Sequence, residues 1–325
     1  MEETAALPDV ADLLEARRAL AGVAVRTPVL RSEALDRLVA GQLFFKAECL
    51  QRTGSFKLRG AYNRVRSLDA AERRRGLITV SAGNAALGAA YAARLAGARL
   101  VVVMPETALP EKLAAVAALG AQIESRGVTN AAEAFARLAE LRHEHGYTLV
   151  HPFDDPLVIA GAGTATWELL EDEPDLELLA VPASGGGLLA GALLAAGALA
   201  RSAHVYGVQP AGADGIVRSL AKGTPTAPER IDTVADGLTA PRPGALNFEI
   251  IRRRAAGVVT VGDDAILDAM GRILRELRVV VEPAGAAALA AVIADERFHR
   301  RRVGVLLSGG NASAERIRQV LAPAG

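Results

Sequence analysis

Short apolar stretches alternate along this chain with longer segments in which apolar residues recur at the spacing of an α-helix. Several short stretches are apolar at successive positions, as in residues 101–103 and 305–307, which is typical of strands that are covered on both faces. The pattern predicts strands at residues 43–47, 77–80, 99–104, 122–125, 148–150, 178–181, 204–209, 258–261 and 302–307.

The longer segments have the periodicity of amphipathic or buried helices. We expect helices at residues 55–68, 85–96, 110–119, 130–145, 187–200, 263–278 and 283–293. Because buried strands alternate with helices, the sequence indicates an α/β protein in which helices wrap parallel sheets. Residues 76–150 form a self-contained βαβαβαβ run and are predicted to be a small domain, inserted into a large domain of residues 1–75 and 151–325.

The composition narrows the classes of partner. Hydrophobic residues make up 51% of the chain and aromatic residues only 4%, which suits layers built from small aliphatic side chains. The net charge is zero, so charge gives no support for a nucleic acid or an anionic membrane as partner. Cys49 is the single cysteine and cannot form an intrachain disulfide, which favours a reducing, cytoplasmic compartment. We expect Cys49 to be a buried small hydrophobe.

One stretch has the length of a membrane span. Residues 178–200 carry no charged side chain. Pro182 and the run at 184–187 interrupt this stretch after four or five residues, so we interpret it as strand, loop and helix. The acidic residues 1–4 do not have the pattern of a secretory signal.

Lys57 is the first candidate for chemistry. The chain has only four lysines against thirty-three arginines, and Lys57 stands between Phe56 and Leu58 at the start of a predicted helix. A partly desolvated lysine can lose its proton and form an imine, whereas an arginine cannot. Lys57 is therefore a candidate Schiff-base residue. The alternative is a lysine whose stem packs at a helix start while its charge stays in water.

Two glycine-containing turns follow predicted strands and open predicted helices, at residues 81–84 and 184–187. Such junctions expose backbone N–H groups at the positive end of a helix dipole and suit an anion. Neither turn has the dinucleotide-binding or Walker pattern. The triple glycine at 185–187 predicts either a phosphate site or a tight contact between helix and sheet.

Three further polar residues lie at element ends. Ser308 ends the last buried strand, so it either faces a ligand at the edge of the sheet or caps the final helix. Glu282 precedes Pro283 and either complements that helix end or faces the edge of a cofactor. His151 is interpreted as a turn residue rather than a base.

Taken in order, these segments resemble the fold-type II pyridoxal-phosphate enzymes, in the group of threonine/serine dehydratases and serine racemases. The resemblance runs from about residue 26 to residue 311. The segments that carry it are Gly-Ser-Phe-Lys-Leu-Arg-Gly-Ala at 54–61, Ser-Ala-Gly-Asn at 81–84, His-Pro-Phe-Asp-Asp-Pro at 151–156, Ser-Gly-Gly-Gly-Leu at 184–188, Ala-Asp-Gly-Leu at 235–238, Glu-Pro at 282–283 and Ser-Gly-Gly-Asn at 308–311.

The resemblance implies a tryptophan-synthase-β-like fold of two open, mostly parallel sheets, with pyridoxal 5'-phosphate held in the large domain and a small domain that closes on substrate. Lys57 would bind the cofactor as a Schiff base, and Ser308 would face its pyridine nitrogen. The other residues that it places at the cofactor are Phe56, Asn84, Ser184, Gly185, Gly186, Gly187, Leu188, Gly237 and Glu282. Those that it places at the substrate are Ser81, Ala82, Gly83, Asn84 and Ala85.

The activity that the resemblance implies is β-elimination of L-threonine or L-serine to a 2-oxo acid and ammonia, with Lys57 as the base. A serine at the pyridine nitrogen makes the ring a weaker electron sink, which favours prompt loss of the β-hydroxyl. A serine-type racemase, a dehydratase for another or bulkier 3-hydroxy amino acid, and a cofactor-binding protein without catalysis remain alternatives. A homodimer is the family-level expectation.

The chain departs from the family pattern at several positions. Ala82 replaces the serine that protonates the opposite face of Cα in racemases of this group, which favours dehydration. Residues 85–87, Ala-Ala-Leu, replace a usual His-x-Gln and make the substrate loop less polar. Gln209 and Gly215 stand where many relatives have cation-binding carboxylates. Asp214 alone is a weak site, so no tightly bound metal is expected. A C-terminal regulatory domain is not expected either, because the chain ends soon after residue 311.

Overall fold

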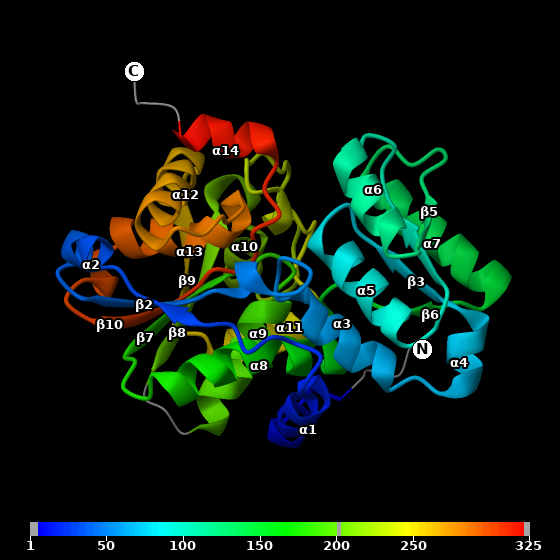
Figure 1. The fold of residues 1–325 in the computed structure, drawn as a ribbon, viewed down its shortest axis with the longest axis horizontal. Helices are drawn as coiled ribbons and strands as arrows, with labels where there is room; N and C mark the ends of the chain where they lie inside the picture. Colours follow the sequence, from blue (N-terminus) through cyan, green and yellow to red (C-terminus); the bar gives the residue numbers. More distant parts are fainter. Residues whose placement is uncertain (1–5, 200–202, 322–325) are drawn as a thin grey trace.

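Two separate sheets organise the protein in this computed structural model, which describes residues 6–199 and 203–321 (Figure 1). The larger sheet has the strand order β1-β2-β10-β7-β8-β9, and the smaller has the order β5-β4-β3-β6. The strands are β1 (Val29–Leu30), β2 (Gln42–Lys46), β3 (Leu77–Val80), β4 (Leu100–Val103), β5 (Gln122–Glu124), β6 (Thr148–Leu149), β7 (Leu178–Pro182), β8 (His204–Pro210), β9 (Gly257–Val261) and β10 (Arg302–Leu306).

Helices cover both faces of each sheet (Figure 1). They are α1 (Val10–Leu20), α2 (Glu33–Val39), α3 (Lys57–Arg66), α4 (Ala70–Arg75), α5 (Asn84–Leu95), α6 (Pro110–Ala118), α7 (Ala131–His145), α8 (Pro156–Asp172), α9 (Gly187–Ala198), α10 (Gly215–Lys222), α11 (Ala245–Arg254), α12 (Asp263–Leu277), α13 (Pro283–Ala294) and α14 (Ala314–Leu321). Four short 3-10 helices join them: η1 (Glu48–Leu50), η2 (Ala211–Ala213), η3 (Asp236–Leu238) and η4 (Glu296–Phe298).

Every strand pair is parallel except β1–β2, so the α/β class expected from the alternating pattern is confirmed. All predicted strands and helices are present with ends within two residues, except that Ala200, at the predicted end of α9, lies outside the described residues. The pattern did not predict the two-residue β1 or the helices α1, α2, α4, α8, α10, α11 and α14. The longest of these is α8. Twelve of its seventeen residues are buried, so the helix lacks the polar stripe on which a periodicity argument depends.

Small residues let α8 and α9 approach closely beneath the larger sheet. A Cβ at Gly191 would lie 2.5 Å from the backbone nitrogen of Gly163, a distance that no side chain tolerates. The two helices therefore pack backbone to backbone and bury the apolar α9 within the core. None of the helices in the described part of the chain is both long and apolar enough to cross a membrane.

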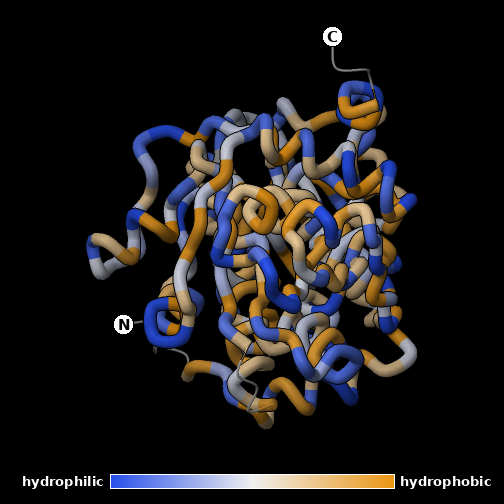
Figure 2. The backbone as a smooth tube through the Cα atoms, turned by 90° about the vertical axis from the view of Figure 1, so that its left-hand side faces the viewer, coloured by the Kyte–Doolittle hydropathy of each residue, from blue (hydrophilic) through white to orange (hydrophobic). Residues whose placement is uncertain are grey.

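The face of the larger sheet opposite to α8 and α9 is covered by α2, α12 and α13. On the outside, α14 carries both hydrophobic and hydrophilic residues (Figure 2), and its Ile317 and Val320 pack against this core. Cys49 is 9% exposed in the same cluster, and burial raises the pKa of its thiol to about 12. It is therefore a buried thiol, and the expectation of a buried small hydrophobe is confirmed.

Helix α3 joins the cores of the two sheets. Its Ala61 and Val65 belong to one buried cluster with Leu77 of β3 and Leu100 of β4, whereas its N-terminal end contacts the larger sheet. The side chains of the smaller sheet thus pack against a helix that precedes residue 76. The small domain of residues 76–150 and its boundary stay a prediction.

Candidate active site

Lys57 is the first residue of α3 and is held against the end of β10. An isolated β-bridge pairs Ser55 with Gly309, and the backbone N–H of Phe56 donates to the carbonyl of Ser308 over 3.1 Å. The turn before the lysine is therefore hydrogen-bonded to the loop after β10. This arrangement fixes where the helix begins and brings Lys57 to the carboxyl edge of the larger sheet.

The Lys57 ammonium is close to the range in which it can act as a base. Its Nζ donates to the carbonyl of Pro152 over 2.8 Å. Burial lowers the pKa of Lys57 to about 8, although the negative charge of Glu282 opposes the shift. At neutral pH, about one lysine in ten is then unprotonated, against about one in several thousand for a solvated lysine. Such a lysine is a competent nucleophile and proton acceptor.

Lys57 lies on the wall of a cavity of ≈ 560 Å³. The cavity is lined from both sheets, by the loops that follow β3, β7 and β10. The structure thus brings together all the residues proposed from the sequence, while their individual roles stay predictions. Those residues are Phe56, Lys57, Ser81, Ala82, Gly83, Asn84, Ala85, Ser184, Gly185, Gly186, Gly187, Leu188, Gly237, Glu282 and Ser308.

The triple-glycine loop forms one end of the cavity. Gly186 has φ +95°, and a Cβ at Gly185 would lie 2.5 Å from the ring of Phe153, so both positions require glycine. Within residues 6–199 and 203–321, the N–H groups of Gly185, Gly186 and Gly187 have no hydrogen-bond acceptor. Unsatisfied N–H groups at the start of a helix are suited to bind an anion.

Neighbouring polar groups hold this loop in place. The Nδ2 of Asn247 on α11 donates to the carbonyls of Gly185, over 2.8 Å, and of Phe153, over 3.0 Å. The carboxylate of Asp154 accepts from the N–H of Ala245, over 2.8 Å, at the start of the same helix. The carbonyl of Gly185 is therefore occupied by α11, and the loop offers its N–H groups rather than its oxygens to an anion.

Glu282 is a buried carboxylate beside Asn84. It is 5% exposed, and its Oε1 accepts from Asn84 Nδ2 over 2.5 Å. Burial, reinforced by the negative charge of Asp236, raises the pKa of Glu282 to about 7, against the opposing hydrogen bond from Asn84. Its helix begins at Pro283, and no Glu282 side-chain hydrogen bond caps it. The side chain is thus turned toward the cavity rather than used at the helix end.

Ser308 lies at the carboxyl end of β10 and does not cap the final helix. It is 5% exposed and lines the cavity, with its Oγ 3.5 Å from the carbonyl of Ala284. The cap of α14 is instead Ser313, whose Oγ accepts from the N–H of Arg316 over 3.2 Å. The N-cap alternative for Ser308 is therefore wrong, and its hydroxyl faces the cavity.

The loop after β3 is short of hydroxyl groups on the cavity side. Ser81 Oγ accepts from the N–H of Gly83 over 3.0 Å, which shapes the turn, and Ala82 has no polar side-chain atom. Across the cavity mouth, Lys112 of α6 forms an ion pair with Asp236 of η3. The remaining wall beyond this loop is largely apolar and includes Leu87, Pro105, Ala115, Val116, Ala134 and Phe135.

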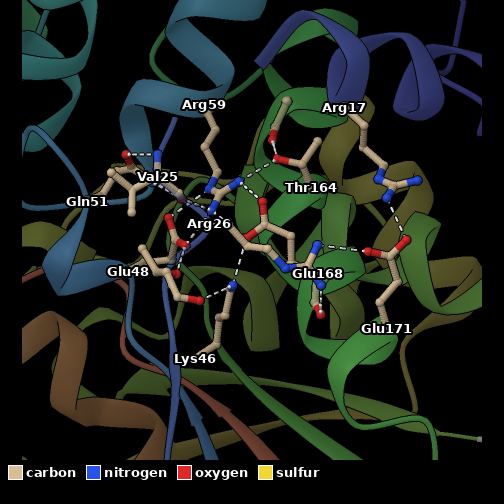
Figure 3. Close-up of polar contacts among 12 residues, drawn as sticks. Arg17, Val25, Arg26, Lys46, Glu48, Gln51, Arg59, Thr164, Glu168 and Glu171 are labelled. Carbon is tan, nitrogen blue, oxygen red and sulfur yellow. Dashed lines mark hydrogen bonds and ion pairs between the residues drawn. The ribbon is translucent and has the colours of Figure 1, made fainter. Parts of the chain in front are cut away.

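A buried charge network lies behind Lys57 (Figure 3). Arg59 is fully buried and donates to both oxygens of Glu48, each over 2.8 Å, and to Glu168 Oε1 over 2.7 Å. Lys46, also fully buried, donates to Glu168 Oε2 over 2.7 Å and to the carbonyl of Thr27 over 2.7 Å. Two cations thus face two carboxylates, which is the balance that buried charges require.

The network links α3 to three other elements. These are β2 through Lys46, η1 through Glu48 and α8 through Glu168. Burial would raise the pKa of Glu48, but the Arg59 guanidinium prevails and lowers it. The apolar pattern and the motifs did not predict this network. Its signals were a lysine and a glutamate in and just after a strand of apolar residues, and an arginine two positions after Lys57.

Gln209 lies near the end of β8 and contacts the start of α10. Its Oε1 accepts from the N–H groups of Ile216, over 2.9 Å, and Val217, over 3.2 Å, at the start of α10. Its Nε2 donates to the carbonyl of Ala213 over 3.1 Å. The amide is 1% exposed and closes this turn by itself. The described residues contain no group of three or more metal-ligating His, Cys, Asp or Glu side chains.

Comparison with known proteins relates this site to a family. The family model described as "Pyridoxal-phosphate dependent enzyme" matches residues 21–309. The chain is 38% identical over 310 residues to the L-threonine ammonia-lyase of Thermotoga maritima, covering 95% of this chain and 77% of that protein. It is 40% identical over 313 residues to the L-threo-3-hydroxyaspartate ammonia-lyase of Pseudomonas sp, covering 95% of this chain and 97% of that protein.

Solved structures show the same likeness. The structure of maize serine racemase superimposes with a TM-score of 0.92 at 36% identity, covering 97% of each chain. The relatives thus include both eliminating and racemising enzymes. Identity at this level settles the fold and leaves the choice of reaction to the residues of the cavity.

Proposed function

Since this chain belongs to the fold-type II pyridoxal-phosphate-dependent enzymes, we propose that it catalyses β-elimination of a 3-hydroxy amino acid such as L-threonine or L-serine, which yields a 2-oxo acid and ammonia. The single observation that carries this proposal is the placement of Lys57, with its lowered pKa, in one cavity with the triple-glycine loop and the hydroxyl-free Ala82. The ammonia-lyases among the relatives support it.

The residues of the cavity fit pyridoxal phosphate. The unsatisfied N–H groups of residues 185–187 suit its phosphate, Lys57 suits its aldehyde, and Ser308 is a neutral hydroxyl that suits its ring nitrogen. Asn84 Nδ2 is a donor for an oxygen on the ring edge. When bound, the cofactor supplies an electron sink for the carbanion formed at Cα.

Lys57 is proposed to move the proton. With the cofactor bound, the neutral amine of Lys57 would take the proton from the substrate Cα. The resulting ammonium would give a proton to the β-hydroxyl as the C–O bond breaks, so that water leaves. The carbonyl of Pro152, which accepts from Nζ over 2.8 Å, orients this amine throughout. The neutral hydroxyl of Ser308 would not keep a ring nitrogen protonated. The ring would then be a weaker electron sink, so prompt elimination would be favoured over a long-lived carbanion.

The racemase alternative needs a second acid on the opposite face of Cα. Ala82 has no proton to donate, and the Oγ of Ser81 is held within the turn by the N–H of Gly83. We therefore propose elimination rather than racemisation. The apolar loop Ala85–Leu87 and the apolar wall around Val116 keep a bulkier 3-hydroxy amino acid open as the preferred substrate.

The test is a substrate panel with the purified enzyme and pyridoxal phosphate. L-Threonine, L-serine, D-serine, L-threo-3-hydroxyaspartate and L-3-phenylserine are incubated, and 2-oxo acid and ammonia are measured together with the chirality of the remaining serine. We expect stoichiometric 2-oxo acid and ammonia from at least one L-substrate, and L-serine that stays L. Accumulation of D-serine without 2-oxo acid would reject elimination in favour of racemisation.

Removal of divalent cations should leave this activity intact. The turn that holds Gln209 and Ala213 is closed by an amide, so no bound cation contributes to its stability. After exhaustive chelation and dialysis, turnover should change by less than about twofold, and the melting temperature should not shift, because no ligand of the native state is lost. Turnover that collapses and returns with added magnesium would contradict this expectation.

Two further features stay predictions. Assembly as a homodimer and a cytoplasmic location rest on the resemblance and on the single cysteine. The closing of residues 76–150 on the substrate is likewise proposed, supported by the contacts that Asn84 and Lys112 make across the cavity with Glu282 and Asp236.

A further inference from the structure

We propose that Asn311 is a positioning residue that sets the direction of the Asn84 amide and so makes Asn84 a hydrogen-bond donor toward the cavity. Asn311 lies in the loop between β10 and α14, whereas Asn84 is the first residue of α5. The Nδ2 of Asn311 donates to the carbonyl of Thr53, over 2.9 Å, and to Asn84 Oδ1, over 2.7 Å. No role was assigned to Asn311 from the sequence.

The direction of the chain of hydrogen bonds follows from Thr53. A backbone carbonyl can only accept, so the Asn311 side chain must turn its NH₂ group toward it. The second proton of the same NH₂ group then points at Asn84, so Asn84 must accept this hydrogen bond with its Oδ1. That choice leaves Asn84 Nδ2 facing Glu282 Oε1 at 2.5 Å. Each amide has one favourable orientation once the first carbonyl is fixed.

Gly54 supplies the space for Asn311. It has φ +71°, which favours glycine, and a Cβ at this position would lie 2.3 Å from Asn311 Oδ1. The turn that precedes Lys57 therefore accommodates the Asn311 side chain directly against its backbone. The backbone N–H of Gly310 donates to the carbonyl of Gly54 over 2.8 Å and holds the two segments together.

This arrangement matters because an amide presents opposite polarity at its two ends. With its oxygen held by Asn311, Asn84 offers N–H to a carboxylate or to an oxygen of a bound ligand. With the amide reversed, its oxygen would face the oxygens of Glu282 and of that ligand, which is repulsive. The inference rests on the proposed function only in naming pyridoxal phosphate as the ligand that accepts the hydrogen bond from Asn84.

The decisive comparison is Asn311→Asp against Asn311→Ala. Aspartate has nearly the same shape but cannot donate to Thr53, and it draws the NH₂ of Asn84 toward itself. We expect the Kd for pyridoxal phosphate, measured by equilibrium dialysis, to rise by at least about 10-fold in Asn311→Asp, more than in Asn311→Ala. The absorption maximum of the bound cofactor should also shift. If Asn311 only fills space, the order is reversed, with alanine worse than aspartate.

A double-mutant cycle tests whether the effect runs through Asn84. If it does, Asn311→Asp should weaken cofactor binding by less than about twofold in an Asn84→Ala background. An equal loss in both backgrounds would overturn the inference. Far-UV circular dichroism and the urea midpoint of each variant identify any that fails to fold. Because the readout is cofactor affinity, an enzyme that binds the cofactor but shows no elimination would reject the proposed function without touching this one.

Discussion

Replacement of Lys57 by alanine should abolish the visible absorption band of the bound cofactor and reduce turnover by at least about 10³-fold. The amine is both the group that suits the cofactor aldehyde and the proposed acceptor of the Cα proton, so one substitution removes two steps. The pKa of about 8 gives a further expectation for the native enzyme. In cofactor-free protein, the rate of reaction with added pyridoxal phosphate should rise as the pH rises toward 8 and level off above it, because the neutral amine reacts.

Lys112→Ala is the matched control for this experiment. Lys112 also lines the cavity, but its ammonium is paired with Asp236 at the mouth. Its loss should leave the visible band in place. Absorption spectra and single-turnover kinetics of both variants decide the question. Turnover that survives in Lys57→Ala, or a band that disappears only in Lys112→Ala, would place the reactive amine elsewhere.

Replacement of Arg59 by methionine should lower the free energy of unfolding by about 3–5 kcal/mol. Methionine has a similar length but leaves the fully buried carboxylate of Glu48 without its bidentate partner and Glu168 with only Lys46. Arg59→Lys keeps the positive charge but loses the bidentate guanidinium contact with Glu48, so its effect on the free energy of unfolding should be intermediate. Urea unfolding of the holoenzyme, followed by far-UV circular dichroism, measures the change as a lower midpoint.

Arg272→Met is the control for a lost surface ion pair. Arg272 and Asp268 are 36% and 50% exposed on α12, and breaking such a pair should cost below about 1 kcal/mol. Combining Arg59→Met with Glu48→Gln removes the stranded charge and should recover part of the lost stability. If Arg59→Met and Arg272→Met unfold at similar urea concentrations, the buried network does not hold α3 in place.

The sequence was sufficient to predict every described strand except β1, half of the described α-helices and the grouping of the site residues. Strands that are apolar on both faces predict a parallel sheet, and the loops after such strands meet at the carboxyl edge of that sheet. The loop at 81–84, the loop at 184–187 and Ser308 follow from that rule, whereas Lys57 was identified from the scarcity of lysine and from its apolar neighbours. The pattern was informative because each residue lies at a junction between a strand and a helix.

Contacts that depend on side-chain reach could not be predicted in this way. Glu168 lies 109 residues after Arg59, on helix α8, which the apolar pattern did not predict. Asn311 reaches Asn84 across 227 residues only because Gly54 has no side chain there. Gln209 was read as a missing metal ligand, and only the structure shows that its amide makes three hydrogen bonds in the turn.

Because Cys49 is buried and the pKa of its thiol is raised, we expect the protein to react only slowly with thiol-directed reagents. Its thiol is the only one in the chain, and with a pKa of about 12 it offers almost no thiolate at neutral pH. A single substitution at an exposed position, such as Ala139→Cys on α7, would therefore allow one fluorophore to be attached without labelling of Cys49. A spectroscopic test of whether the two sheets move relative to each other during turnover would need no prior removal of the native thiol.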